Sequence, residues 1–108
     1  TLGCGFIPSP NHSGGLRYHG MAPQVSALME RGLMEAETVG QKEIMEVGVL
    51  FSKCQGILPA PESCHAIASA IKHAKNPENK GKTILFNLSG HGMLDLFAYD
   101  RHLAGDIA

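Results

Sequence analysis

Two polar residues, Ser89 and Glu62, each come shortly after an apolar segment that is typical of a short buried strand. Ser89 follows residues 83–88, which are rich in Ile, Leu and Phe, and Glu62 follows residues 57–58 across two prolines. In an open parallel sheet ligands bind just beyond the carboxyl ends of the strands, so both side chains are expected at one crevice. A hydroxyl there can hydrogen-bond a ligand, and a carboxylate can move a proton. The alternative is that Ser89 caps the next helix and Glu62 stabilises a helix dipole.

Glycines are frequent around Ser89 and in the first part of the chain. Gly90 and Gly92 let backbone N–H groups come close to a ligand. Residues 1–20 contain five glycines and two prolines without hydrophobic periodicity, which predicts an extended, ordered loop that presents backbone groups to a ligand. Such a loop normally lies across a larger body, and the chain opens on Thr1, so we expect it to be part of a longer polypeptide.

The composition excludes several classes of protein. At 108 residues, 44% hydrophobic and 18% charged, the chain is expected to form at most one globular domain. A net charge of -1 argues against nucleic acid or an anionic membrane bound through bulk electrostatics, and no apolar run is long enough to span a bilayer. Cys4, Cys54 and Cys64 are odd in number and form no CxxC pair, which indicates reduced thiols in a cytoplasmic protein.

The remaining reactive side chains do not form a recognisable site. His65 and His73 are eight residues apart on one predicted helix, too far to share a metal ion. A Cys64-His65 dyad also fails, because adjacent helical residues point about 100° apart. A Walker-type phosphate loop needs Lys after its second glycine, and Gly90-His-Gly92 has none. The residues alone therefore predict a ligand-lining α/β subdomain without a specified chemistry.

Apolar periodicity predicts four helices and three short strands that alternate along the chain. The helices are expected at residues 23–31, 41–55, 61–74 and 93–103, and the strands at residues 33–39, 57–58 and 83–88. This order predicts an α/β fold with a short parallel sheet, right-handed crossovers and a three-layer αβα arrangement. Residues 22–108 would form its body and residues 1–21 the Gly/Pro-rich loop. Gly48 predicts a close approach of its helix to the sheet.

Three motifs follow one another along the chain. They are Gly14-Gly-Leu-Arg-Tyr-His-Gly-Met-Ala-Pro23, Gly56-Ile-Leu-Pro-Ala-Pro-Glu-Ser-Cys-His-Ala66 and Phe86-Asn-Leu-Ser-Gly-His-Gly92. Together they resemble the carboxyl-terminal third of the tryptophan synthase beta chain, in its second, divergent type. Because they span almost the whole chain in order, the resemblance is far more specific than a single motif would be.

The resemblance implies the carboxyl-terminal portion of a fold type II enzyme that uses pyridoxal 5'-phosphate. Such an enzyme is a carbon-oxygen lyase that joins L-serine to indole to give L-tryptophan and water, in amino-acid biosynthesis. The family's cofactor lysine and glycine-rich phosphate loop lie in the amino-terminal two thirds, and no lysine here stands in their sequence setting. The resemblance therefore implies that this chain is inactive without an amino-terminal part. It also implies a homodimer and an alpha-chain partner.

The resemblance assigns four residues to the cofactor's surroundings. Ser89 would hydrogen-bond the pyridine nitrogen, as a weak partner that leaves this nitrogen largely unprotonated. Gly90 beside it would let the backbone approach the cofactor. Glu62 would lie near the cofactor ring and help the proton transfer that deprotonates indole. Gly15 would offer a backbone carbonyl near the cofactor.

The first motif carries two further implications. The backbone carbonyls of Tyr18 and Gly20 would help to coordinate a monovalent cation. Arg17 stands where the commoner type of beta chain has an aspartate that contacts the substrate, and an arginine could hold a phosphate or carboxylate of another donor. Cys64 and His91 also differ from the commoner Ser and Arg, and we assign them no role.

Two alternatives stay open. One is another fold type II lyase or synthase, such as a sulfhydrylase, that acts on serine or O-phosphoserine through the same Ser89 site. The other is a non-catalytic, stand-alone α/β binding domain. If an amino-terminal part is needed, the surface that meets it should expose apolar side chains, for which Phe6, Ile7, Met21 and Phe97 are candidates.

Overall fold

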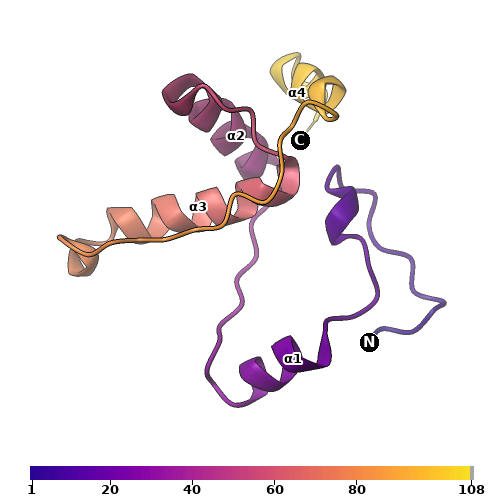
Figure 1. The fold of residues 1–108 in the computed structure, drawn as a ribbon. Helices are drawn as coiled ribbons and strands as arrows, with labels where there is room; N and C mark the ends of the chain where they lie inside the picture. Colours follow the sequence, from indigo (N-terminus) through magenta and orange to yellow (C-terminus); the bar gives the residue numbers. More distant parts are fainter. Residues whose placement is uncertain (108) are drawn as a thin grey trace. The chain divides into compact units, whose positions relative to one another are not determined.

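The computed structural model describes residues 1–107, and its regular elements are helical (Figure 1). The elements in chain order are η1 (Gly14–Leu16), α1 (Pro23–Glu30), α2 (Gln41–Gln55), α3 (Pro61–Lys75), η2 (Pro77–Asn79) and α4 (Leu96–Leu103), where η denotes a 3-10 helix. The chain divides into two compact units, residues 1–38 and the residues from Val39 onward. In the described residues, none of the helices has the length and apolar character needed to cross a bilayer.

Residues 1–38 are held in shape mainly by hydrogen bonds and contain almost no buried core. The backbone N–H of Leu2 donates to the His19 carbonyl at 2.6 Å, and the Arg17 guanidinium donates to the Pro8 carbonyl at 3.2 Å. Ser13 is the one buried residue of this fully described range. A loop that buries so little of its own surface depends on backbone pairing for its shape.

The four predicted helices are present, and their ends follow known rules. Pro23 and Pro61 occupy the first positions of α1 and α3, where the N–H that proline lacks is not needed. α2 ends at Gly56, whose φ of 70° lies in the left-handed region that glycine adopts most easily. α4 begins at Leu96 instead of residue 93, because residues 93 and 94 form a turn in front of it.

The core of the second unit lies where α2 packs against both α3 and α4. Its buried members are Ile44 and Met45 on α2, Cys64 on α3, and Ala98 and Tyr99 on α4. Helical spacing predicts an apolar stripe on α2 that includes Ile44, Leu50 and Cys54, and one on α3 that includes Cys64 and Ile67. Ile44, Cys64 and Ile67 are buried, but Leu50 and Cys54 are exposed, and Met45, outside the predicted stripe, is fully buried. The periodicity therefore identified only part of the buried faces.

Gly48 marks the closest approach of α2 to its neighbours. A Cβ atom at position 48 would lie 2.9 Å from the Cys64 sulfur and closer still to the Tyr99 hydroxyl oxygen. The close approach predicted from this glycine is therefore present. Its neighbours, however, are the helices α3 and α4 and not a sheet.

The predicted parallel sheet is not formed within residues 1–107, which corrects the sequence-based expectation. Residues 33–39, 57–58 and 83–88 are in no strand, and the bridge between Pro59 and His91 is isolated and antiparallel. Pro59 and Pro61 remove two backbone donors just after residues 57–58, so this segment cannot sustain a ladder of hydrogen bonds. The described residues thus form the four expected helices, but not the sheet or the three-layer arrangement.

Residues 83–89 nevertheless show the side-chain alternation of a strand. Phe86 and Leu88 are half-buried, and the Phe86 ring meets Phe51 of α2 edge to face with the ring centroids 6.1 Å apart. Leu85, which directly precedes Phe86 in the chain, is 95% exposed. Successive side chains of extended backbone point to opposite faces. One face of this segment therefore packs on the helices, and the other is exposed to solvent.

Candidate functional site

Two short backbone segments from distant parts of the second unit are joined at the candidate site. The N–H of Ala60 donates to the Gly90 carbonyl at 2.9 Å, and the N–H of Gly92 donates to the Leu58 carbonyl at 2.7 Å. These bonds flank the antiparallel bridge at Pro59. They hold the start of α3 beside the segment that carries Ser89.

This pairing places Ser89 at the first turn of α3. The Ser89 and Ser63 hydroxyl oxygens lie 3.4 Å apart, and Ser63 directly follows Glu62 in the chain. Ser63 is buried, Glu62 is half-buried and Ser89 is exposed. The structure therefore brings Ser89, an exposed residue, beside the residue next to Glu62.

Gly90 can pair with Ala60 at close range because it lacks a side chain. A Cβ atom at position 90 would lie 3.1 Å from the Ala60 Cβ and 3.9 Å from the Ser63 hydroxyl oxygen. The first distance is tighter than ordinary van der Waals contact, so a larger residue would push residues 89–91 away from α3. Glycine is thus needed here for close backbone approach.

The first turn of α3 is an electrostatically positive environment. Glu62 lies in that turn, where the helix dipole stabilises its negative charge. The Nδ1 atom of His65 lies 3.1 Å from the Pro61 carbonyl oxygen and 3.2 Å from that of Glu62, so this ring nitrogen carries a proton and donates it. The first turn of α3 thus carries Glu62 and Ser63, and the Ser89 hydroxyl oxygen lies 3.4 Å from that of Ser63.

Tyr99, on the core side, stabilises the pairing of residues 58–60 with residues 90–92. Its hydroxyl donates to the Pro59 carbonyl at 2.7 Å and lies 3.4 Å from the Cys64 sulfur. Because the single hydroxyl proton goes to Pro59, the Cys64 thiol must donate to the Tyr99 oxygen. α4 thereby fixes the peptide that leads into α3.

Burial keeps both Cys64 and Tyr99 protonated. Desolvation raises the pKa of the Cys64 thiol above its ordinary value of 9.0, and the hydrogen bond with Tyr99 opposes part of that rise. Desolvation, followed by the contact with Cys64, raises the pKa of Tyr99 far above its ordinary value of 10.0. The pair is therefore neutral at ordinary pH and links α3 to α4.

The thiols are expected to differ sharply in reactivity. Cys4 and Cys54 are exposed and Cys64 is buried, and the thiolate is the reactive form. In a native-state titration with a thiol-specific aromatic disulfide, we expect two thiols to react promptly and the third only after denaturation. Mass spectrometry of the labelled peptides identifies them, and prompt labelling of Cys64 would contradict the packing described here.

Alkaline pH is expected to weaken the second unit. Both Cys64 and Tyr99 have pKa values that are higher in the folded chain than in the unfolded chain. Their contribution to stability is complete below pH 9 and is lost as the pH rises above it, because the unfolded chain then releases protons that the folded chain retains. Urea unfolding at several pH values measures this fall. The Cys64→Ala variant should show a shallower fall, and an equal one would contradict the assignment.

The candidate residues of the first motif lie in the other unit. Gly15 is the middle residue of η1. The hydroxyl of Tyr18 donates to the sulfur of Met21 at 3.5 Å, and a Cβ at Gly20 would lie 3.2 Å from Thr1. Tyr18 and Gly20 line a hollow of about 340 Å³. Its other lining residues are Thr1, Leu2, His19, Met21 and Ser26. In the described residues no three His, Cys, Asp or Glu side chains gather as a metal-binding group.

Two contributors to the site were missed by sequence reasoning. Ser63 has a signal in the sequence, since it occupies the third position of a helix that begins at Pro61, in the same motif as Glu62. Tyr99 has none, because it lies 40 residues from the carbonyl that it binds. His91, which received no role, is exposed, and its Nδ1 accepts a hydrogen bond from the Met93 N–H at 3.2 Å.

The expected resemblance is supported by comparison with known proteins. No protein-family model matches the chain. A tryptophan synthase beta chain of Thermosipho africanus is 58% identical over 101 residues, which make up 92% of this chain and 24% of that protein. Beta chains 2 of Methanosarcina mazei and Aquifex aeolicus are 51% and 52% identical over 109 residues, which make up 99% of this chain and 25% of each relative.

These relatives are much longer than the chain. It spans about a quarter of the length of the curated proteins that it matches. The identity of about one half extends across both structural units and all three motifs, because it covers nearly every residue of the chain. Over almost its entire length, the chain is therefore homologous to part of the tryptophan synthase beta chain.

Proposed function

We propose that this chain is the carboxyl-terminal part of a tryptophan synthase beta chain, which uses pyridoxal 5'-phosphate to join L-serine to indole. The observation that carries this proposal is the homology across nearly the whole chain. The meeting of Ser89 with the first turn of α3 supports it independently. Bound pyridoxal 5'-phosphate supplies an electron sink for the bonds made and broken on serine.

The surroundings of Ser89 fit the pyridine ring of this cofactor. Its hydroxyl is exposed, and the neighbouring Ser63 oxygen at 3.4 Å can orient it. We assign to Ser89 a hydrogen bond to the ring nitrogen, and to Gly90 the space for the ring to approach the backbone. A hydroxyl is a weak acid, so it leaves the nitrogen largely without a full positive charge.

Glu62 is the residue that we assign to proton movement. Glu62 lies in the first turn of α3. A carboxylate can accept the proton that indole loses. Glu62 would therefore act on the second substrate, while Ser89 acts on the cofactor.

The residues of the first unit are assigned roles through their backbone groups. We assign to Gly15 a carbonyl near the cofactor and to Tyr18 and Gly20 carbonyls that bind a monovalent cation. Monovalent cations prefer oxygen ligands, and a loop rich in glycine can turn its carbonyls toward one point. Both units would then belong to a single subdomain of the enzyme.

We also propose that residues 83–89 become a strand of a parallel sheet in the larger protein. One face of the segment already lies on the helices, and Leu85 on the other face is 95% exposed. The exposure of Ile7 at 85% and Phe97 at 72%, with that of Phe6 and Met21, fits a surface covered by the rest of the enzyme. Such a sheet would give the three-layer arrangement that the alternation of elements predicts.

Several properties follow if this assignment is right. The chain alone would be inactive, because no lysine in it stands in the setting of the family's cofactor lysine. The complete enzyme would form a homodimer, associate with an alpha chain, and work in the cytoplasm. The described thiols are free, which suits a reducing compartment.

A chimaera tests the proposal. This chain replaces the corresponding quarter of the Thermosipho africanus relative, and the product is assayed for tryptophan from indole with either serine or O-phosphoserine. We expect activity with serine, and none from the relative with that quarter deleted. Activity with O-phosphoserine alone would favour the other fold type II enzyme. Cofactor binding without tryptophan from either donor would contradict the proposed reaction.

Ser63 offers a graded test of how Ser89 is held. In the chimaera, Ser63→Ala should lower kcat by about two- to fivefold with little change in KM, because a long hydrogen bond between neutral groups contributes only about 0.5–1 kcal/mol. The absorption spectrum of the bound cofactor should shift with it. A kcat equal to that of the parent would show that Ser63 does not orient Ser89.

A further inference from the structure

Tyr99 of α4 contacts both of the backbone segments that pair at the candidate site. Its hydroxyl donates to the Pro59 carbonyl at 2.7 Å, in the segment before α3. On the other segment, a Cβ atom at Gly92 would lie 3.1 Å from the Cε2 atom of the Tyr99 ring and closer still to the Pro59 carbonyl oxygen. A side chain at position 92 would therefore push the ring away from the pairing. One residue thus contacts the segment that leads to Glu62 and the segment that carries Ser89.

The Tyr99 side chain is itself held on several sides. It is 4% exposed, and its oxygen accepts the hydrogen bond of the Cys64 thiol at 3.4 Å. A Cβ atom at Gly48 of α2 would lie 2.9 Å from the Cε1 atom of its ring. The Tyr99 N–H donates to the Asp95 carbonyl at 3.1 Å, and the Asp95 N–H donates to the Gly92 carbonyl at 2.9 Å. In such close packing the hydroxyl has little freedom to move.

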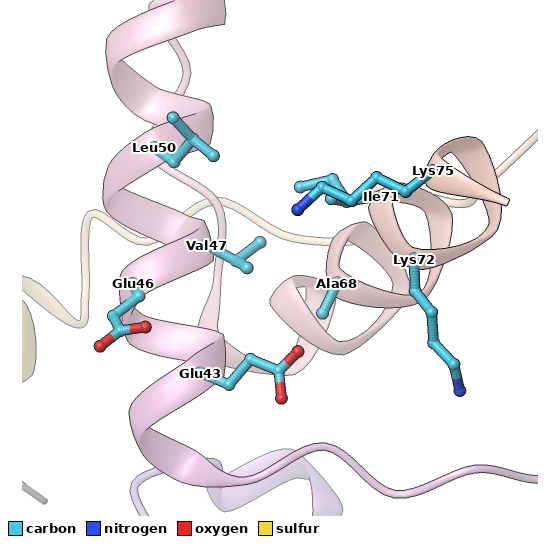
Figure 2. Close-up of a pocket in the computed structure, with 8 residues that line it drawn as sticks. All are labelled: Glu43, Glu46, Val47, Leu50, Ala68, Ile71, Lys72 and Lys75. Carbon is cyan, nitrogen blue, oxygen red and sulfur yellow. The ribbon is translucent and has the colours of Figure 1, made fainter.

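Further along α3, the contact with α2 is looser. A groove of about 470 Å³ lies between the two helices (Figure 2). It is lined by Glu43, Glu46, Val47 and Leu50 of α2 and by Ala68, Ile71, Lys72 and Lys75 of α3. Cys64, which contacts Tyr99, directly follows Ser63, whereas the groove begins four residues later at Ala68. The contacts at Tyr99 are therefore the ones placed to fix the first turn of α3.

We propose that Tyr99 is a positioning residue, which keeps Ser89 and the first turn of α3 in one fixed arrangement. Tyr99 is buried in the core, so it acts through the Pro59 carbonyl and not by contact with a ligand. A displacement of about 1 Å at reacting groups can lower a rate by about 100-fold, so a bond that holds the two segments together contributes to the rate. This inference rests on the proposed function of Ser89 and Glu62.

The Tyr99→Phe variant of the chimaera removes the hydroxyl and keeps the ring. We expect kcat to fall about three- to fivefold with little change in KM for serine or indole, because the groups that bind the substrates remain while their alignment loosens. The absorption spectrum of the bound cofactor should shift. Ile44→Val is the matched control, because it removes a methylene from the same buried core and touches no hydrogen bond. The control should keep the kcat and the spectrum of the parent.

A double-mutant cycle with Ser89→Ala asks whether Tyr99 acts through Ser89. In the Ser89→Ala background, Tyr99→Phe should lower kcat by a smaller factor than in the parent, because the hydroxyl that it helps to place is gone. Cys64→Ala, which removes the thiol that donates to Tyr99, should lower kcat less than Tyr99→Phe does, and it replaces that variant if Tyr99→Phe fails to fold. Equal factors in the two backgrounds, or a parent-like kcat and spectrum, would overturn the proposal.

Amide hydrogen exchange in the 108-residue chain tests the positioning without the reaction. The N–H groups of Ala60 and Gly92 form the two bonds of the pairing. Tyr99→Phe should speed their exchange by at least about threefold relative to the amides of α2, whereas Ile44→Val should speed both groups alike. A uniform change in the Tyr99→Phe variant would overturn the proposal. A chimaera that makes no tryptophan would contradict the proposed function, and these exchange rates would then decide the inference.

Discussion

Replacing Ser89 by alanine is expected to lower kcat of the chimaeric enzyme by about tenfold or more. A hydrogen bond to the cofactor's ring nitrogen contributes roughly 1–2 kcal/mol, and each 1.36 kcal/mol corresponds to a factor of ten in rate. Ser89 is exposed, whereas Ser63, whose hydroxyl oxygen lies 3.4 Å away, is buried and is less accessible to the cofactor. Steady-state kinetics with serine and indole, together with cofactor titration, measure the effect.

Two further variants separate the hydroxyl's chemistry from its volume. Ser89→Thr keeps the hydroxyl and should retain most of the activity, whereas Ser89→Asp should lose more than the alanine variant because a carboxylate would hold the ring nitrogen protonated. The absorption spectrum of the bound cofactor should change most in the aspartate variant. Parent-like kinetics in the alanine variant would exclude Ser89 as the partner of the cofactor.

The second large effect is expected on stability, from Gly48→Ala. In an exposed helix this substitution would stabilise by about 1 kcal/mol. Here the added Cβ would lie 2.9 Å from the Cys64 sulfur and closer to the Tyr99 hydroxyl, which also donates to Pro59. Overpacking and the strained hydrogen bond outweigh the propensity, so the free energy of unfolding should fall by about 2 kcal/mol, measured by urea unfolding followed by circular dichroism.

A matched glycine and a double mutant test the cause. Gly40→Ser adds a side chain where a Cβ would meet nothing within 4 Å and where φ is −72°, so it should be neutral or slightly stabilising as a helix cap. Tyr99→Phe removes the clashing hydroxyl and should cost less stability in the Gly48→Ala background than alone. Additive costs would show that the clash with Tyr99 is not the reason.

Local patterns predicted the helices well because their signals are short in range. Pro23 and Pro61 at helix starts, Gly56 at a helix end, and the apolar stripe through Ile44 are all read within a few residues. The same signals predicted the four α-helices of residues 1–107, but not the two 3-10 helices. The start of α4 was displaced, because the turn before it is set by the hydrogen bond from Asp95 N–H to the Gly92 carbonyl.

The strands could not be predicted in the same way. Residues 83–89 have the composition and the alternation of a strand, but a strand also needs neighbours that supply hydrogen bonds along its edges. Residues 57–58 are followed by Pro59 and Pro61, which have no N–H donors, and the described chain offers residues 83–89 no partner of sufficient length. The pattern therefore predicted the extended conformation without establishing the sheet.

The sequence by itself determined the positions of the four α-helices, part of their buried faces, and the similarity to tryptophan synthase beta chains. Only the tertiary structure decided that Ser89 meets Ser63, that Tyr99 braces Pro59, and that Gly48 contacts two helices. The reason is the range of the interactions. Helix formation depends on residues three or four apart, whereas these contacts join residues 26 to 40 positions apart or three separate helices, whose meeting depends on the packing of the whole unit.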